Sequence, residues 1–290
     1  MTKEQKIAYL CLLPSLVLMG TVIFYPICNT FVTAFYRVNP FGMRIKFWGW
    51  MNFIRLFSRE EFWSSLYNTF IWTGGVVGFT VIWSLGLSLV LNEKFKGRSL
   101  TRGILLLPWA TSLIITALIW RWTLNPEYGL LNHFLSQIGL LHGRINWVAR
   151  WETSFPMMIW IGILVSIPFT TTVFLAGLQA IPLQLYEAAN VEGAGSWARF
   201  RYITMPLLKP VFTIALLLNV IYVFNSFPII WAITGGDPAD TTHIIITYLY
   251  KVAFFYNDFG LASAMALIVF IILLSFSTIY TMVYYKGELY

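Results

Sequence analysis

Charged side chains are scarce in this sequence of 290 residues. Asp, Glu, Lys and Arg together make up 11% of the residues, whereas hydrophobic types make up 58%. Soluble domains usually carry about a quarter charged residues, and a soluble fold could not hide this much apolar surface. The composition therefore predicts an all-α integral membrane protein, with the bilayer as the solvent for much of the chain.

Cysteine and histidine are also rare. Cys11 and Cys28 both fall in the first apolar segment, which predicts buried packing residues and no disulfide. The three histidines, His133, His142 and His243, lie far apart in loops and do not have the spacing of a metal site. We therefore expect neither a metal nor a cofactor in this chain.

Motifs of catalysis and of nucleotide binding are missing. The sequence contains no GxxxxGK[ST] phosphate loop, no HExxH, no GxSxG and no CxxC. We expect no catalytic residues, and so the chain is not expected to be an enzyme. The net charge of +7 comes from basic residues scattered between apolar segments. Such scatter disfavours a nucleic-acid partner and is typical of contact with lipid headgroups.

Six segments are long and apolar enough to cross a bilayer, which requires about 20 residues each. The predicted spans are Ile7–Tyr36, Tyr67–Leu91, Ile104–Leu124, Phe155–Leu178, Leu207–Ile233 and Gly260–Tyr284. No linker or repeat separates them, so residues 1–290 are predicted to form one domain. Lys and Arg are denser in the loops on the side of the two termini, which places both termini in the cytoplasm.

The six predicted spans contain neither Asp nor Glu. Intramembrane carboxylates are the usual machinery of proton-coupled and sodium-coupled carriers. Their absence argues against an ion-coupled secondary carrier, which we keep as an alternative from another functional class. A third class is a membrane scaffold that recruits a cytoplasmic partner without transporting anything.

A polar loop, residues 182–206, separates the fourth span from the fifth. Its first half has the pattern of a short amphipathic helix, with Leu185, Ala188, Ala189 and Val191 on one side and Glu187, Asn190 and Glu192 on the other. Gly193 and Gly195 would end this helix, because glycine accepts the left-handed turn at a helix terminus. The pattern alone fits either an ordinary interfacial helix or a docking site for another protein.

The spacing of this loop resembles the EAA loop of binding-protein-dependent ABC importer permeases. The matching residues are Glu187-Ala188-Ala189, Gly193, Ile203 and Pro206. Flanking segments resemble the maltose-type carbohydrate branch: Asn68-Thr69, Trp120-x-Trp122, Tyr128–Asn132, Ala176–Pro182 and Thr234–Pro238. This sequence departs from the usual family pattern at two positions. It has Glu192 where the family usually has Asp, and Met205 where the family often has Leu.

The resemblance implies a six-helix type I ABC importer permease fold in the cytoplasmic (inner) membrane of a prokaryote. It implies that the loop docks on a cytoplasmic ATPase through Glu187, Ala188, Ala189, Glu192, Gly193 and Pro206. An ATPase dimer would bind the ATP and Mg. A second, homologous permease subunit would complete the pathway, and an extracytoplasmic solute-binding protein would deliver the solute.

Polar residues in the fifth span are candidates for contact with the solute. Asn219, Tyr222 and Ser226 have a spacing that would put them on one face of a helix, and the resemblance places this helix along the substrate site. Ser166 and Phe169 in the fourth span are the next candidates, since an aromatic ring can stack on a sugar. The polar residues could instead form hydrogen bonds between helices.

The absence of charge on this face favours a neutral solute, because a charged solute would call for a counter-charge at membrane depth. We therefore predict an importer of a neutral sugar, oligosaccharide or polyol. Glycerol phosphate remains the alternative by the same mechanism, since a partner permease could supply the missing charge.

Overall fold

The structure is a computed structural model that describes residues 3–286, with side chains described over residues 9–284. Residues 1–2 and 287–290, the chain ends whose cytoplasmic location was predicted, lie outside the described residues. The chain divides into two compact units. The first is drawn from residues up to Trp63 together with Tyr248–Ser275, and the second from Ser64–Thr247 together with residues from Phe276 onward. The prediction of a single domain stays a prediction.

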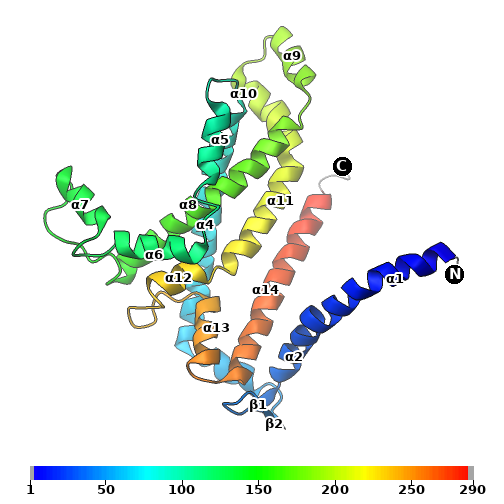
Figure 1. The fold of residues 1–290 in the computed structure, drawn as a ribbon, viewed down its shortest axis with the longest axis vertical. Coiled ribbons are helices and arrows are strands. Elements are labelled where there is room, and N and C mark those ends of the chain that lie inside the picture. The colour runs from blue at the N-terminus through cyan, green and yellow to red at the C-terminus, as the bar shows by residue number, and fades with distance from the viewer. Residues whose placement is uncertain (1–2, 287–290) are drawn as a thin grey trace. The chain divides into compact units, whose positions relative to one another are not determined.

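Helices dominate the described residues, and one two-stranded antiparallel hairpin interrupts them (Figure 1). In chain order the elements are α1 (Lys3–Leu18), the π-helix η1 (Met19–Phe24), α2 (Tyr25–Thr33), β1 (Tyr36–Val38), β2 (Arg44–Phe47), α3 (Met51–Phe57), α4 (Glu60–Asn92), α5 (Arg98–Leu106), α6 (Leu113–Thr123), α7 (Leu130–Gln137), α8 (Trp151–Gln179), α9 (Leu183–Val191), α10 (Ser196–Arg199), the π-helix η2 (Phe200–Thr204), α11 (Met205–Phe224), α12 (Pro228–Ile233), α13 (Ile245–Phe254) and α14 (Phe259–Lys286).

Five helical segments of the described chain are long and apolar enough to cross a membrane. They are Tyr9–Thr33, Glu60–Asn92, Trp151–Gln179, Ser196–Ile233 and Phe259–Tyr284. Each overlaps a predicted span, and Ser196–Ile233 begins 11 residues before the predicted start at Leu207. The remaining predicted span, Ile104–Leu124, is not one continuous helix, because turns at residues 107–112 separate α5 from α6. Pro108 lies in this break, where it removes a backbone donor.

The core of the second unit is formed where α4, α8 and α11 pack closely. Gly162 on α8 faces Trp72 and Val76, and an added Cβ would lie 2.9 Å from each. Further along α8, Gly177 similarly admits Leu208 and Val211 of α11. Trp72 also donates its indole N–H to the carbonyl of Val223 at 2.9 Å, which satisfies a backbone acceptor at the end of α11. Small residues in α8 thus allow the helices to approach, as is typical of membrane helix packing.

The first unit holds the hairpin against the ends of two spans. Asn52 of α3 is buried and donates to the carbonyls of Ala34 and Tyr36 at 2.8 and 2.9 Å. Gly260, at the start of α14, packs on the same group, since an added Cβ would lie 3.0 Å from the Tyr36 oxygen. Asn52 therefore fixes the chain where α2 ends and β1 begins.

The predicted burial of the two cysteines is wrong within this chain. Cys11 and Cys28 are free thiols on exposed positions of the first span. None of the 18-residue window that identifies this span is buried. An apolar segment can leave its whole surface exposed when lipid or another subunit supplies the apolar surroundings, and periodicity does not reveal that arrangement.

Candidate functional site

The polar loop contains the predicted short helix, α9, and a glycine at its C-terminal end caps the helix. Gly193 has a backbone φ of +80°, a conformation that only glycine adopts without strain. The N–H of Gly193 donates to the carbonyl of Asn190 at 3.0 Å, and the N–H of Ala194 donates to that of Ala189 at 2.8 Å. These two bonds make a Schellman motif. The prediction that Gly193 ends a short helix is confirmed.

The surface of α9 is open on both its polar and its apolar sides. Glu187, Ala188 and Glu192 are exposed, and neither glutamate has an ion-pair partner among the described residues. Val191 is 90% exposed at the end of the helix. This small acidic surface, with the apolar side chain of Val191 at one end, is suited to bind in a groove of another protein.

The rest of the loop links α9 to the following span. The hydroxyls of Tyr186 and Thr204 lie 2.9 Å apart, and Arg199 donates to the side-chain oxygen of Asn190. Gly195 differs from the prediction, because it precedes the first residue of α10 and does not end α9. Pro206 is the second residue of α11, which directly follows the π-helix η2, so its missing N–H removes one backbone hydrogen bond from a continuous helical segment. The loop is therefore tied to the fifth span by side chains as well as by the backbone.

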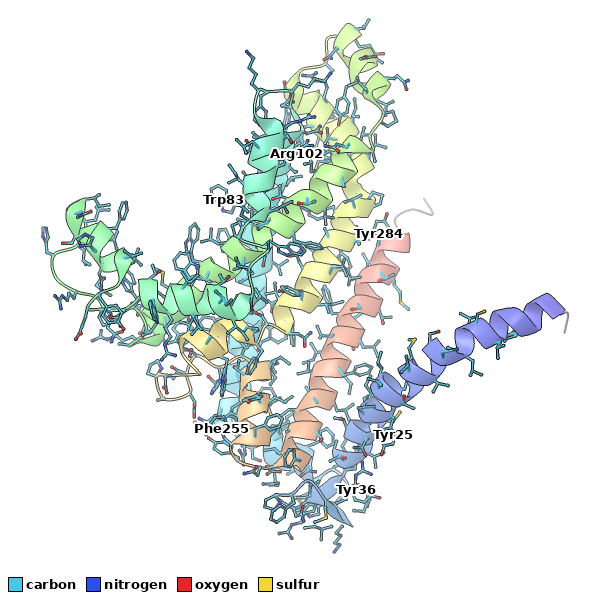
Figure 2. The ribbon with its side chains drawn as sticks, in the orientation of Figure 1. Tyr25, Tyr36, Trp83, Arg102, Phe255 and Tyr284 are labelled. Atoms are coloured by element: carbon cyan, nitrogen blue, oxygen red, sulfur yellow. The ribbon has the colours of Figure 1, made fainter. Side chains whose placement is uncertain are left out.

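Arg102 lies near this loop and is not among the functional residues predicted from the sequence. It lies on α5 (Figure 2) and donates to the carbonyl of Leu91 at 2.8 Å. The side-chain oxygen of Gln179, in the amide orientation that satisfies both groups, accepts from Arg102 at 2.8 Å. Gln179 is the last residue of α8. Arg102 thus joins the ends of α4 and α8 just before the polar loop, through contacts too distant in sequence to show a pattern.

The predicted solute residues in the fourth and fifth spans meet in part. Asn219 of α11 is buried, and its side-chain oxygen accepts a hydrogen bond from Thr170 of α8 at 3.1 Å. Its amide donates to the carbonyl of Ala215. Ser166 is buried and donates to the carbonyl of Gly162 within its own helix. Asn219 therefore joins α8 to α11, the interhelical arrangement that the sequence left open as an alternative.

The prediction that Asn219, Tyr222 and Ser226 share one helix face is wrong for Ser226. Helix α11 ends at Phe224, and Ser226 lies buried beyond that end. Pro228 begins α12 and cannot donate a backbone hydrogen bond that would continue α11. Tyr222 is 55% exposed, unlike buried Asn219.

Phe169 is paired with an aromatic residue that the sequence did not identify. Its ring stacks on that of Trp109, with centroids 6.0 Å apart and planes inclined by 19°. Both side chains are exposed. Trp109 occupies the break between α5 and α6, so the interrupted helix is what brings it to Phe169. A proline followed by tryptophan within an apolar run, Pro108-Trp109, is the sequence feature that could have indicated this break.

The flanking motifs shape the loop after α12. Asn68 of α4 donates to the carbonyls of Thr241 and His243 at 2.7 and 3.0 Å, and Thr69 accepts from the N–H of Ile245 at 2.8 Å. Gly236 has φ +103°, and a side chain there would collide with the His243 ring. These residues hold a loop in place and need no solute to explain them. Among the described residues, no cluster of His, Cys, Asp or Glu could hold a metal.

Known proteins are similar to this chain over almost its full length. Residues 78–286 match the family described as "Binding-protein-dependent transport system inner membrane component". A probable ABC transporter permease protein of Brucella abortus biovar 1 (strain 9-941) is 49% identical over 286 residues, which cover 99% of each chain. The trehalose/maltose transport system permease protein MalF of Thermococcus litoralis is 38% identical over 280 residues, or 96% of this chain and 93% of that protein.

A solved structure agrees with these sequence matches. A bacterial ABC transporter involved in the import of the acidic polysaccharide alginate has a chain that superimposes with a TM-score of 0.88 at 26% identity, over 98% of this chain and 96% of that one. The chain therefore belongs to the family of inner membrane components of binding-protein-dependent transport systems, the permease subunits of ABC importers.

Proposed function

We propose that this chain is one of two permease subunits in an ATP-driven importer of a neutral sugar, oligosaccharide or polyol. The observation that carries the proposal is the exposed helix α9, which a left-handed Gly193 ends within the polar loop. Relatives that carry sugars support the solute class, because the trehalose/maltose permease matches the chain from end to end.

Helix α9 would couple the chain to a cytoplasmic ATPase dimer, which would bind ATP and Mg. Exposed Glu187 would meet basic or polar groups of the ATPase, and Ala188 would allow close approach. ATP-driven closure of the two ATPases would move α9 and the attached helices, so that the spans alternate between inward-open and outward-open states. Arg102 would help to carry this movement, because it joins the end of α8 to α5 and α4.

The solute would pass beside α8 and α11. The stacked rings of Phe169 and Trp109 offer an exposed apolar face, which a sugar ring requires in addition to hydroxyl partners. Asn219, Tyr222, Ser166 and Ser226 are the candidate polar partners. No Asp or Glu lies in the middle of the apolar helices. The charged residues of α8 and α11 are Glu152, in the first turn of α8, and Lys209, in the second turn of α11. The middle of both helices is therefore without charge, which favours an uncharged solute.

The arrangement in the membrane would follow from this role. Six spans are proposed, with α5 and α6 together forming the third, and both termini and the polar loop lie in the cytoplasm of a prokaryote. A second permease subunit would cover part of the exposed first span. An extracytoplasmic solute-binding protein would dock on the opposite side.

Uptake measurements test the proposed function. Cells that lack this chain are supplied with labelled neutral sugars, polyols and glycerol phosphate, with and without the gene restored. Uptake of one neutral solute that needs both this chain and an ATPase would support the proposal. Uptake of glycerol phosphate alone would establish the alternative solute. Uptake that persists without the ATPase and collapses with the ion gradient would establish an ion-coupled carrier.

A further inference from the structure

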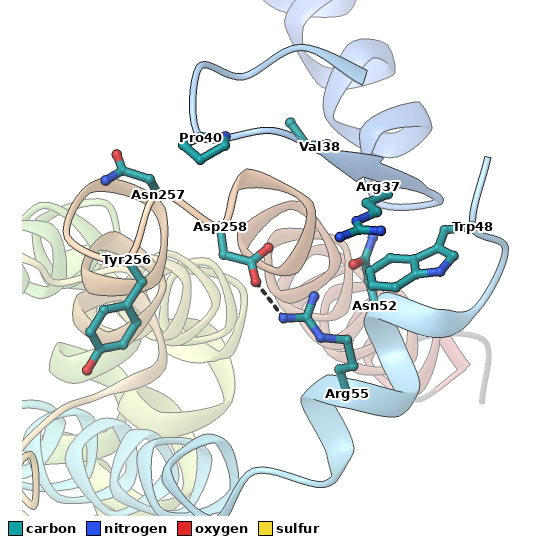
Figure 3. Close-up of a pocket in the computed structure, with 9 residues that line it drawn as sticks. All are labelled: Arg37, Val38, Pro40, Trp48, Asn52, Arg55, Tyr256, Asn257 and Asp258. Atoms are coloured by element: carbon teal, nitrogen blue, oxygen red, sulfur yellow. Dashed lines mark hydrogen bonds and ion pairs between the residues drawn. The ribbon is translucent and has the colours of Figure 1, made fainter. Parts of the chain in front are cut away.

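The first unit contains an open, polar pocket of about 340 Å³ that the transport role does not use (Figure 3). Its wall includes Arg37 from the hairpin, Trp48, Asn52 and Arg55 from the segment that follows, and Asp258 before α14. Both guanidinium groups lie over the Trp48 ring, at 5.5 Å for Arg37 and 5.3 Å for Arg55. Tyr256 and Asn257 lie across the opening.

The charges in this pocket do not balance. Arg55 is paired with Asp258 at 2.9 Å, and the second carboxylate oxygen of Asp258 accepts from the N–H of Leu261 at 3.1 Å. Each carboxylate oxygen of Asp258 therefore already has a partner, one in Arg55 and the other at the start of α14. Arg37 is exposed and has no ion-pair partner among the described residues. The pocket thus presents one unpaired guanidinium beside a paired one, which suits a bidentate anion such as a phosphate.

The pocket lies at the level of lipid headgroups. The first candidate span ends at Thr33, shortly before Arg37, and the last one begins at Phe259, immediately after Asp258. Residues at the ends of two apolar spans lie at the boundary between hydrocarbon and water. This placement depends on the spans crossing the membrane and holds for either orientation of the chain.

An exposed apolar strip adjoins the pocket. Ile45 and Phe47 alternate with Arg44 and Lys46 along β2, so their side chains share one side of the strand. Phe41 and Met43 precede β2 in the hairpin turn, and all four apolar side chains are 61–85% exposed. The intervening Arg44 and Lys46 point to the other side, and Arg44 bonds Thr33 at the end of the first span. Aromatic and aliphatic side chains next to basic ones are typical of segments that lie in the headgroup region.

We propose that this pocket binds the phosphate of an anionic phospholipid, with Arg37 as the principal contact and Arg55 as the second donor. The hairpin strip would lie against the acyl chains of the same lipid layer. An acidic side chain of a docking protein would match the charge equally well, but it would leave the apolar strip uncovered. The proposal rests on the membrane placement above and does not depend on which solute is carried.

Lipid retention tests this inference directly. The purified complex is exposed to dioleoyl phosphatidylglycerol, dioleoyl phosphatidylcholine or inorganic phosphate, and bound lipid is counted by native mass spectrometry. We expect the anionic lipid to be retained in preference to the zwitterionic one, and Arg37→Gln to weaken that retention about tenfold, because the variant removes a hydrogen bond between two charged groups. Arg37→Lys should keep most of the effect.

Lys46→Gln is the matched control. Lys46 pairs with Arg37 in the hairpin register and is exposed, but it does not line the pocket. Equal losses for Arg37→Gln and Lys46→Gln would show nonspecific attraction and overturn the site. Competition by inorganic phosphate at the same concentration as the lipid would overturn the lipid assignment. Unchanged lipid retention with weaker docking of the solute-binding protein would assign the pocket to that protein. Each result stands whether or not sugar uptake is found.

Discussion

Replacement of Gly193 by alanine tests whether the geometry of the polar loop is needed for coupling. Gly193 has φ +80°, and no atom lies within 4 Å of the position of an added Cβ. The substitution therefore creates no collision, and its whole effect comes from backbone strain. A residue with a side chain costs about 1–2 kcal/mol in the left-handed region, so the native end of α9 becomes about 5–30 times less populated relative to alternatives.

Gly195→Ala provides the matched control in the same loop. Gly195 also has no atom within 4 Å of an added Cβ, but its φ is −67°, which alanine adopts freely. Gly195 is the N-cap of α10, and its replacement by alanine, a poorer N-cap, costs up to about 1 kcal/mol. We expect Gly193→Ala to reduce co-purification of the ATPase and coupled uptake about 5–30-fold, while Gly195→Ala changes either by less than about fivefold. Equal behaviour of the two variants in pull-down and proteoliposome uptake would refute the reasoning.

Three further predictions concern the coupling charge and the solute path. Glu187→Gln should weaken ATPase association by no more than about fivefold and should make it less sensitive to salt, because an exposed interfacial charge contributes about 1 kcal/mol or less; unchanged salt dependence in the pull-down would remove Glu187 from the interface. Asn219→Ala should raise the solute concentration for half-maximal uptake about 2–10-fold, whereas Thr170→Val, which removes the hydroxyl that contacts Asn219 and the Ser166 carbonyl but keeps the Asn219 amide, should raise it less; equal effects would assign Asn219 to helix packing alone. Trp109→Ala should also raise that concentration about 2–10-fold, in line with the 0.5–1.5 kcal/mol typical of ring contacts, and should do so for ring-shaped sugars but not for linear polyols; the same change for both solutes would contradict stacking.

Much of the architecture could be predicted because a bilayer imposes a simple length rule. Five predicted spans overlap long apolar helices, and the family inferred from the EAA spacing is confirmed. The end of α9 at Gly193 could be predicted for a local reason, since only the preceding residues and the glycine itself decide whether a Schellman motif forms.

The solute path was harder to predict because it depends on where helices stop. The early end of α11 separates Ser226 from Asn219, and the break at Pro108 brings Trp109 to Phe169. The sequence shows prolines at both places, but apolar composition continues through them. Arg102 gave no signal at all, since its partners Leu91 and Gln179 are 11 and 77 positions away along the chain. Contacts between distant segments cannot be read from periodicity.

ATPase activity of the reconstituted complex is the most direct test of the proposed function. The chain is co-expressed with its partner permease and ATPase, placed in lipid, and assayed with the solute-binding protein loaded in turn with neutral sugars, polyols and glycerol phosphate. We predict that one loaded neutral solute stimulates hydrolysis, and that Gly193→Ala abolishes most of this stimulation. Failure to form a complex with any ATPase, or hydrolysis that no loaded binding protein alters, would contradict the account.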